Sequence, residues 1–170
     1  MGKYNFEPKI IAFCCHYCAF AAADLAGTMR LQYPPNVRII RTPCTGRLEA
    51  NYYMRAFERG ADGILVAGCL EGGCHFIDGN LYARRRVEAV QEILKESGLE
   101  PERLRMVNLS SAMAKPLVDY MSEMVNTIKD MGPSPLNKKK KQIKPEPLRA
   151  SSTTTRSASS SCTMTIWIKS

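Results

Sequence analysis

The sequence lacks any apolar run that approaches the roughly 20 residues needed to cross a bilayer. Near Met1 it also lacks the apolar core of a signal peptide and the hydroxyl residue of a myristoylation site. We therefore expect a cytoplasmic protein without a membrane segment. In that compartment, seven cysteines are typical of metal ligands or redox thiols rather than of a disulfide framework.

Motifs for nucleotide binding and hydrolysis are absent as well. No predicted strand is followed by a Gly-x-Gly-x-x-Gly, Walker or Ser/His/Asp pattern. This absence argues against a nucleotide pocket and a hydrolytic centre. We accordingly predict no catalytic residue and no substrate site on this chain.

The composition changes sharply after Asn137. Residues 138–170 are first Lys-rich and then Ser/Thr-rich, with too little apolar surface to offset the entropy of ordering. They also carry +7 of the formal charge of +8, which leaves a nearly neutral body and argues against nucleic-acid binding. We expect an α/β domain over residues 1–137 and a disordered basic tail over 138–170, whose Cys162 is not expected to be a ligand.

Short apolar runs alternate with longer amphipathic segments along the body of the chain. The runs predict strands over residues 10–13, 37–42, 63–67 and 104–109, and the segments predict helices over 19–32, 48–59, 80–97 and 112–131. Strands that alternate with helices pair in parallel through right-handed crossovers. The predicted fold is therefore a three-layer α/β sandwich with a four-stranded, mainly parallel sheet of flavodoxin or Rossmann type.

Six of the seven cysteines lie within residues 14–74, each just after a predicted strand. They are Cys14, Cys15, Cys18, Cys44, Cys69 and Cys74. The first three share one predicted turn, where free N–H groups and the helix dipole would favour the thiolate, the form that binds metal. Because the carboxyl ends of parallel strands meet at one edge of a sheet, we expect these thiols to converge there on one iron-sulfur cluster.

Other interpretations of these cysteines remain open. Cys15 and Cys18 form a Cys-x-x-Cys pair that could serve as a redox dithiol, although Cys44, Cys69 and Cys74 would then have no role. A zinc-stabilised docking protein would normally use two short knuckles, whereas Cys69 and Cys74 are separated by four residues. That spacing occurs in plant-type ferredoxins, and the neighbouring glycines would let the backbone approach a cluster. A single cysteine could also be an ordinary buried side chain.

Side chains beside the cysteines have more ordinary interpretations. His16 and His75 could ligate iron, but with enough thiols present we expect them to be hydrogen-bond donors near the ligands or surface groups. Three aromatic residues are expected to pack against the site: Tyr17, Phe76 and Tyr82. Three consecutive arginines are expected to form a solvated helix face: Arg84, Arg85 and Arg86.

From residue 10 to about residue 137 the sequence resembles the delta subunit of methyl-viologen-reducing hydrogenase. The resemblance is carried by Cys-His-Tyr-Cys at 15–18, Ala-Asp-Leu-Ala-Gly at 23–27, Gln-Tyr-Pro-Pro-Asn-Val-Arg-Ile-Ile-Arg at 32–41, Gly-Ala-Asp-Gly at 60–63, Gly-Cys at 68–69 and Cys-His-Phe-Ile-Asp-Gly-Asn at 74–80. It implies a 2Fe-2S cluster and electron transfer from hydrogenase subunits, or another donor, to the flavin-containing subunit of heterodisulfide reductase in anaerobes.

The sequence departs from the family pattern in three places and has one extra cysteine. The usual Cys-Asn-Trp-Cys is Cys-His-Tyr-Cys here, Leu-Glu-Gly-Gly at 70–73 replaces His-Pro-Gly-Asp, and the tail after Asn137 has no counterpart. The family's first cysteine aligns with Cys15, which makes Cys14 the extra one. Five candidates then match four ligand positions: Cys15, Cys18, Cys44, Cys69 and Cys74.

Overall fold

The computed structural model describes residues 6–137. Four parallel strands form one sheet in the order β2-β1-β3-β4. They are β1 (Ile10–Cys15), β2 (Val37–Thr42), β3 (Gly63–Cys69) and β4 (Leu104–Leu109). This order is that of the flavodoxin-like doubly wound folds, so the predicted fold class is confirmed.

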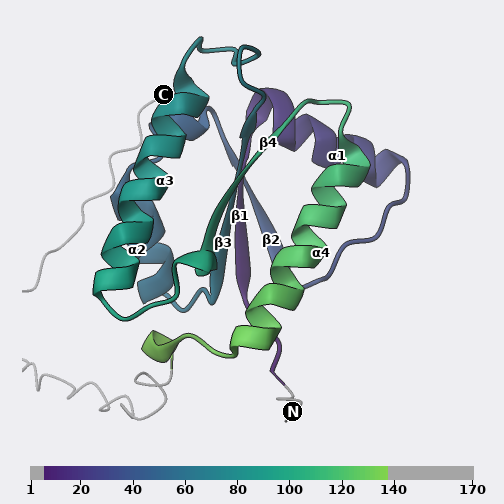
Figure 1. Cartoon of the computed structure of the whole chain (residues 1–170). Helices are drawn as coiled ribbons and strands as arrows, with labels where there is room; N and C mark the ends of the chain where they lie inside the picture. Colours follow the sequence, from purple (N-terminus) through teal and green to yellow (C-terminus); the bar gives the residue numbers. More distant parts are fainter. Residues whose placement is uncertain (1–5, 138–170) are drawn as a thin grey trace, which may run out of the picture.

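Helices cover both faces of the sheet (Figure 1). They are α1 (Ala21–Thr28), α2 (Ala50–Glu58), α3 (Gly79–Glu96) and α4 (Ala114–Met131). Side chains of α1 and α4 pack in the core on one face, and those of α2 and α3 pack on the other. The result is the expected three-layer sandwich, with each amphipathic helix turning its apolar side to the sheet.

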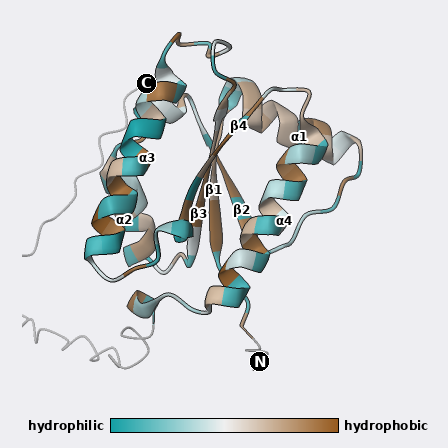
Figure 2. Ribbon diagram, in the orientation of Figure 1, coloured by the Kyte–Doolittle hydropathy of each residue, from teal (hydrophilic) through white to brown (hydrophobic). Residues whose placement is uncertain are grey.

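Burial along the strands follows their position in the sheet. All seven residues of the central strand β3 are buried, whereas only the first and last residues of the edge strand β2 are buried. Figure 2 shows the apolar character concentrated on the strands and the polar character on the outer sides of the helices. Parallel strands enclosed between two helical layers need such apolar sequences, which is why the four runs could be identified as strands.

Two predicted boundaries were wrong at the edge where the cysteines gather. Strand β1 extends through Cys15 and strand β3 through Cys69, so both continue two residues further than predicted. A π-helical turn over His16–Phe20 then precedes α1, which ends at Thr28 rather than at residue 32. Glycine and cysteine residues at the strand ends obscured the boundary, because each strand continues beyond its run of larger apolar side chains.

A buried polar network closes the opposite, amino edge of the sheet. The carboxylate of Asp62 accepts hydrogen bonds from the backbone N–H groups of Lys9 (3.0 Å) and Ser134 (3.1 Å) and from the side chain of Asn137 (2.8 Å). The guanidinium of Arg103, which is 1% exposed, donates to the carbonyls of Asp62 and Gly132, both at 3.0 Å. These hydrogen bonds tie the segment after α4 to the start of β3.

None of the helices within residues 6–137 combines the length and the apolar character that a membrane span requires. The predicted tail over residues 138–170, including Cys162, lies outside the described residues, so its expected disorder stays a prediction.

Candidate metal centre

Two buried thiols meet where the central strands end. Cys15 is the last residue of β1 and Cys69 the last of β3, and each is 1% exposed. Their Sγ atoms lie 3.5 Å apart. Strands β1 and β3 are hydrogen-bonded neighbours, so the parallel pairing itself brings together two residues that are 54 positions apart in sequence.

Two less buried thiols join this pair from the segments that follow the strands. Cys18 lies in the π-helical turn after β1, and Cys74 lies in the loop between β3 and α3. The side chains of Cys18 and Cys74 both interact with that of Cys69. Cys69 is therefore the residue through which the turn after β1 and the loop after β3 meet.

The fifth thiol comes from the loop after the edge strand β2. Cys44 precedes a short 3₁₀ turn (Thr45–Arg47), and its Sγ accepts a hydrogen bond from the backbone N–H of Gly46 at 3.4 Å. Its side chain also interacts with that of Cys74. The carboxyl ends of three strands thus supply the five-thiol group, which consists of Cys15, Cys18, Cys44, Cys69 and Cys74.

Two glycines make this approach possible. A Cβ atom on Gly79 would lie 2.5 Å from the Sγ of Cys44 and 3.3 Å from that of Cys74. A Cβ atom on Gly46 would lie 2.6 Å from the backbone carbonyl oxygen of Gly79. Real Cβ atoms do not approach other atoms so closely, so the turn after β2 and the start of α3 can meet only because both positions lack a side chain.

Burial decides the protonation of most of these thiols in the metal-free chain. It raises the pKa of Cys18, Cys44 and Cys69 above the ordinary thiol value. For Cys18 and Cys44 this overrides the opposing effect of one hydrogen bond each, from the side chain of Cys69 and the backbone of Gly46 respectively. The expectation that the turn after β1 favours thiolates was therefore wrong for Cys18, because desolvation outweighs the one favourable interaction there, with the side chain of Cys69.

Cys74 behaves in the opposite way. Its partial burial alone would raise the pKa, but the backbone N–H groups of Phe76, Asn80 and Gly79, together with the side chain of Cys69, lower the pKa overall. Gly79 and Asn80 are the first two residues of α3, and the side chain of Asp78 makes no capping bond to this helix. The sulfur of Cys74 thus occupies the N-terminus of α3 in place of a side-chain cap.

Cys14 does not belong to the group, and its predicted place just after a strand was wrong. It is the fifth residue of β1, fully buried in the core on the face covered by α1 and α4. Burial, with a smaller contribution from Cys15, raises its pKa to about 12. Successive strand residues point to opposite faces of the sheet, and Cys14 therefore has the role of an ordinary core residue.

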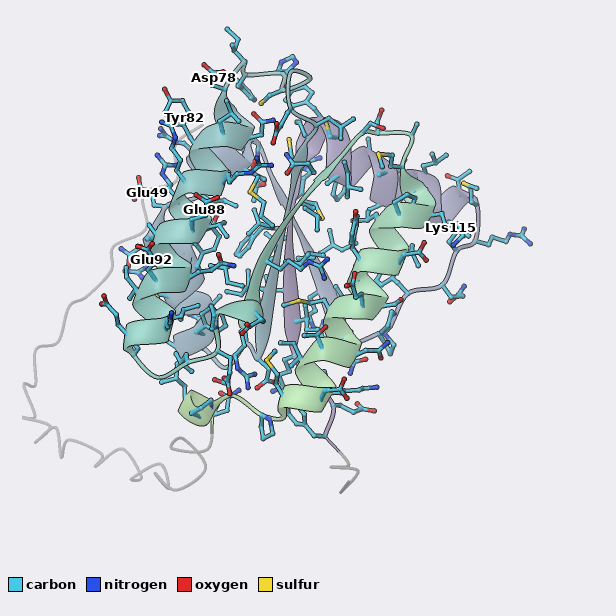
Figure 3. All side chains as sticks on the ribbon, in the orientation of Figure 1. Glu49, Asp78, Tyr82, Glu88, Glu92 and Lys115 are labelled. Carbon is cyan, nitrogen blue, oxygen red and sulfur yellow. The ribbon has the colours of Figure 1, made fainter. Side chains whose placement is uncertain are left out.

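The aromatic neighbours cover the outside of this edge. The rings of Tyr17 and His75 stack with centroids 3.8 Å apart, and the ring of Phe76 meets both edge-on. All three side chains are exposed, as is Ile77, whose positive φ of 61° is rare for a β-branched residue. Figure 3 shows Asp78 and Tyr82 at the same end of the molecule, at the start of α3. His16 is exposed, as expected for a surface group.

Two of the three arginines were misjudged as a solvated face. Arg84 pairs with Glu71 and donates to the side-chain oxygen of Asn108 at 3.2 Å. Arg86 donates to the backbone carbonyls of Gly46 and Leu48. The arginine run therefore braces the loops that carry the thiols, in addition to facing solvent.

Sequence reasoning did not single out the asparagines beside the group. Asn80 and Asn108 both donate side-chain hydrogen bonds to the carbonyl of Cys69. The sequence did place Asn80 at the start of a predicted helix and Asn108 near the end of a predicted strand. Both positions lie on the edge that was predicted to hold the site. Such residues are ordinary in any loop, so their partners emerge only from the fold.

Within residues 6–137, no three histidine, cysteine, aspartate or glutamate side chains are arranged to hold a single metal ion. The five thiols are instead connected pairwise, with Cys69 and Cys74 each linked to more than one other thiol.

Fold and site together define a flavodoxin-like α/β protein that gathers thiols at the carboxyl edge of its sheet. The chain belongs to the family of methyl-viologen-reducing hydrogenase delta subunits, whose family model matches residues 10–132. The resemblance noted in the sequence is thereby confirmed.

Known relatives of the chain include short and long proteins. One short relative is the vhu iron-sulfur subunit of the F420-non-reducing hydrogenase of Methanopyrus kandleri, 46% identical over 127 residues, which cover 75% of this chain and 96% of the relative. Another is the iron-sulfur subunit of the F420-non-reducing hydrogenase of Archaeoglobus profundus, 41% identical over 129 residues, covering 76% of this chain and 94% of the relative. A long relative is one of the subunits of the ferredoxin:CoB-CoM heterodisulfide reductase of Methanosarcina mazei, 42% identical over 126 residues, covering 74% of this chain but 16% of the relative.

Proposed function

We propose that this chain is an electron-transfer protein that holds one 2Fe-2S cluster on four of its five grouped thiols. The single observation that carries the proposal is the meeting of Cys15, Cys18, Cys44, Cys69 and Cys74 at the carboxyl edge of the sheet, with Sγ atoms as close as 3.5 Å. Bound there, the cluster would accept and release one electron at a time. The short relatives are named iron-sulfur subunits, which supports this choice of cofactor.

The donor set suits a cluster with two irons better than one metal ion. A 2Fe-2S cluster takes two thiolates on each iron, so it needs two pairs of thiols rather than four ligands around one point. Cys15 with Cys69, and Cys44 with Cys74, are pairs already in contact, and Cys18 offers a further thiol beside Cys69. Gly46 and Gly79 keep the space beside Cys44 free of side-chain atoms.

The chain's own residues would bind, orient and shield the cluster. Burial of Cys15 and Cys69 excludes water from one side, and the backbone N–H groups at the start of α3 donate to the sulfur of Cys74. Hydrogen bonds to ligand sulfurs stabilise their negative charge and are one of the means by which proteins set the potential of such clusters. The thiols that burial leaves protonated in the metal-free chain would lose their protons on binding iron.

The proposed partners are hydrogenase subunits on one side and the flavin-containing subunit of heterodisulfide reductase on the other, in the cytoplasm of an anaerobe. The names of the relatives support both sides: some are hydrogenase subunits, and another belongs to a heterodisulfide reductase and contains a stretch similar to this chain. The same domain thus occurs as a separate hydrogenase subunit and as part of a heterodisulfide reductase chain. This occurrence fits a role in electron transfer between the two enzymes.

Anaerobic purification followed by metal and sulfide analysis tests the cofactor. A 2Fe-2S protein should contain two irons and two sulfides per chain, show visible charge-transfer absorption and give an electron paramagnetic resonance signal after one-electron reduction. Colourless protein with one zinc would support a docking protein instead. Metal-free protein with a reducible disulfide would support the dithiol alternative on Cys15 and Cys18.

Single Cys→Ser changes at the five positions should then separate four ligands from one spare thiol. Four variants should lose iron or change their spectrum, and the fifth should retain both. Cys14→Ala is the matched control, because Cys14 lies outside the group, and it should retain the cluster. Loss of the cluster from Cys14→Ala alone would contradict the proposed ligand set.

A further inference from the structure

Asn80 is almost completely buried at the start of α3, 2% exposed, and its side chain is fully used. Its Nδ2 group donates to the carbonyl oxygens of Cys69 at 3.2 Å and of Leu70 at 2.9 Å. Its Oδ1 atom accepts from the backbone N–H of Leu81 at 2.9 Å. The amide therefore joins the last residue of β3 to the first turn of α3.

The backbone of the same residue acts on the other end of the loop. The backbone of Gly79 lies against the sulfur of Cys74, where an added Cβ atom would be 3.3 Å away, and the backbone N–H groups of Gly79 and Asn80 lower the pKa of that thiol. Asn80 consequently contacts Cys69 through its side chain and Cys74 through its main chain. The four residues between these cysteines include two glycines, Gly72 has a φ of +72°, and a backbone hydrogen bond within the loop runs from the N–H of Gly73 to the carbonyl of Leu70.

A second amide supports the same carbonyl from the neighbouring strand. The Nδ2 group of Asn108 donates to the carbonyl of Cys69 at 2.5 Å, and its Oδ1 atom accepts from Arg84 at 3.2 Å. Arg84 also pairs with Glu71 in the loop itself. The network connects β3, the loop, α3 and β4, and Asn80 is the member that reaches both cysteines.

We propose that Asn80 is a positioning residue that fixes Cys69 and Cys74 relative to each other for cluster binding. The inference rests on the proposed function, because it assigns Asn80 a role toward the cluster held by that group. Replacement of its amide removes the two hydrogen bonds that tie the carbonyls of Cys69 and Leu70 to α3, and it loosens the loop without removing a thiol. Partners of metal ligands of this kind typically contribute about 10- to 100-fold to metal retention.

The test compares Asn80→Ala with Asn137→Ala. The side chain of Asn137 also donates to a backbone carbonyl, that of Gly60, and to Asp62, but it lies at the opposite edge of the sheet. Both changes should therefore destabilise the fold, and only Asn80→Ala should act on the cluster. We expect Asn80→Ala to release iron to a chelator on the order of tenfold faster and to shift the g-values and the reduction midpoint.

A second measurement uses the metal-free protein. Iodoacetamide should label Cys69 faster in Asn80→Ala than in either the unchanged chain or Asn137→Ala, because the loop no longer holds the end of β3. Equal labelling of Cys69 in Asn80→Ala and Asn137→Ala would overturn the positioning role. If the protein binds a cluster, equal iron release from the two variants together with unchanged g-values would overturn it as well. If the unchanged chain binds no cluster yet Asn80→Ala still accelerates labelling, the proposed function fails and the positioning of the two cysteines by Asn80 stands.

Discussion

The Sγ atoms of Cys15 and Cys69 face each other across neighbouring parallel strands at 3.5 Å, while the side chain of Cys18 interacts with that of Cys69. This geometry predicts which disulfide forms when the metal-free chain is oxidised. Diamide takes two electrons and two protons from a pair of thiols, and the Cys15–Cys69 pair is already in contact. Peptide mapping of a Cys162→Ser variant should find this disulfide as the main product.

The buried Cys14 provides an internal control for that oxidation. Its thiol is fully buried and separated from the five-thiol group, so it should remain reduced. Cys15→Ser should abolish the main disulfide. A dominant Cys15–Cys18 disulfide would instead favour the Cys-x-x-Cys dithiol interpretation over the convergence of strand ends.

The second prediction concerns Gly79. Its replacement by alanine places a Cβ atom 2.5 Å from the sulfur of Cys44, well inside contact distance. Cys44 must then move away, so Gly79→Ala should weaken iron retention by roughly tenfold or more, measured as iron per chain after chelator treatment. Alanine is itself favoured over glycine within helices, so the helix should persist and circular dichroism should change little.

Gly27→Ala is the matched control for Gly79→Ala. Gly27 lies within α1, and no atom approaches within 4 Å of its added Cβ. The change should stabilise the protein by about 0.5–1 kcal/mol through backbone entropy and leave the iron content unchanged. Equal iron retention in the two variants would show that the close packing at Gly79 is irrelevant to the site.

The third prediction separates the stability of the fold from the site. Asp62→Asn removes the charge that accepts from Lys9, Ser134 and Asn137, and its new amide N–H group must face a donor. Urea denaturation should show a loss of about 2 kcal/mol in the free energy of unfolding. Iron content and spectrum should not change, since Asp62 lies at the amino edge. Asp119→Asn, in an exposed pair with Lys115, should cost below about 0.5 kcal/mol.

Much of the fold could be predicted because its signals are local. The fully apolar run at β3 and the regular apolar spacing of α4 identify a buried strand and a covering helix without knowledge of any partner. Parallel pairing follows from their alternation. The ends of the strands were less predictable. Cys14, Cys15 and Cys69 belong to strands, but clustered cysteines are also typical of the loops that form a metal site, so the sequence placed them after the strands.

The candidate site could be predicted only as an edge. Topology places the ends of β1 and β3 together, and hence Cys15 beside Cys69. Cys14 is excluded from the five-thiol group because neighbouring residues of a strand point to opposite faces of the sheet. The prediction ended β1 at residue 13 and so did not treat Cys14 as a strand residue. The contacts of Asn80, Asn108 and Arg84 depend on three-dimensional packing between elements distant in sequence, and no spacing rule reports them.

The last prediction concerns thiol reactivity in the metal-free chain. Cys74 and Cys18 are both partly buried, but the pKa of Cys74 is lowered by three backbone N–H groups, whereas burial raises that of Cys18. Iodoacetamide reacts with the thiolate, so its rate rises with pH until the pKa is passed. Labelling of Cys74 should therefore be faster than that of Cys18 at neutral pH and should level off at a lower pH. Mass spectrometry of peptides labelled across a pH series measures both rates. Identical pH profiles would mean that the start of α3 does not stabilise the thiolate of Cys74, and the cap assigned to that sulfur would be wrong.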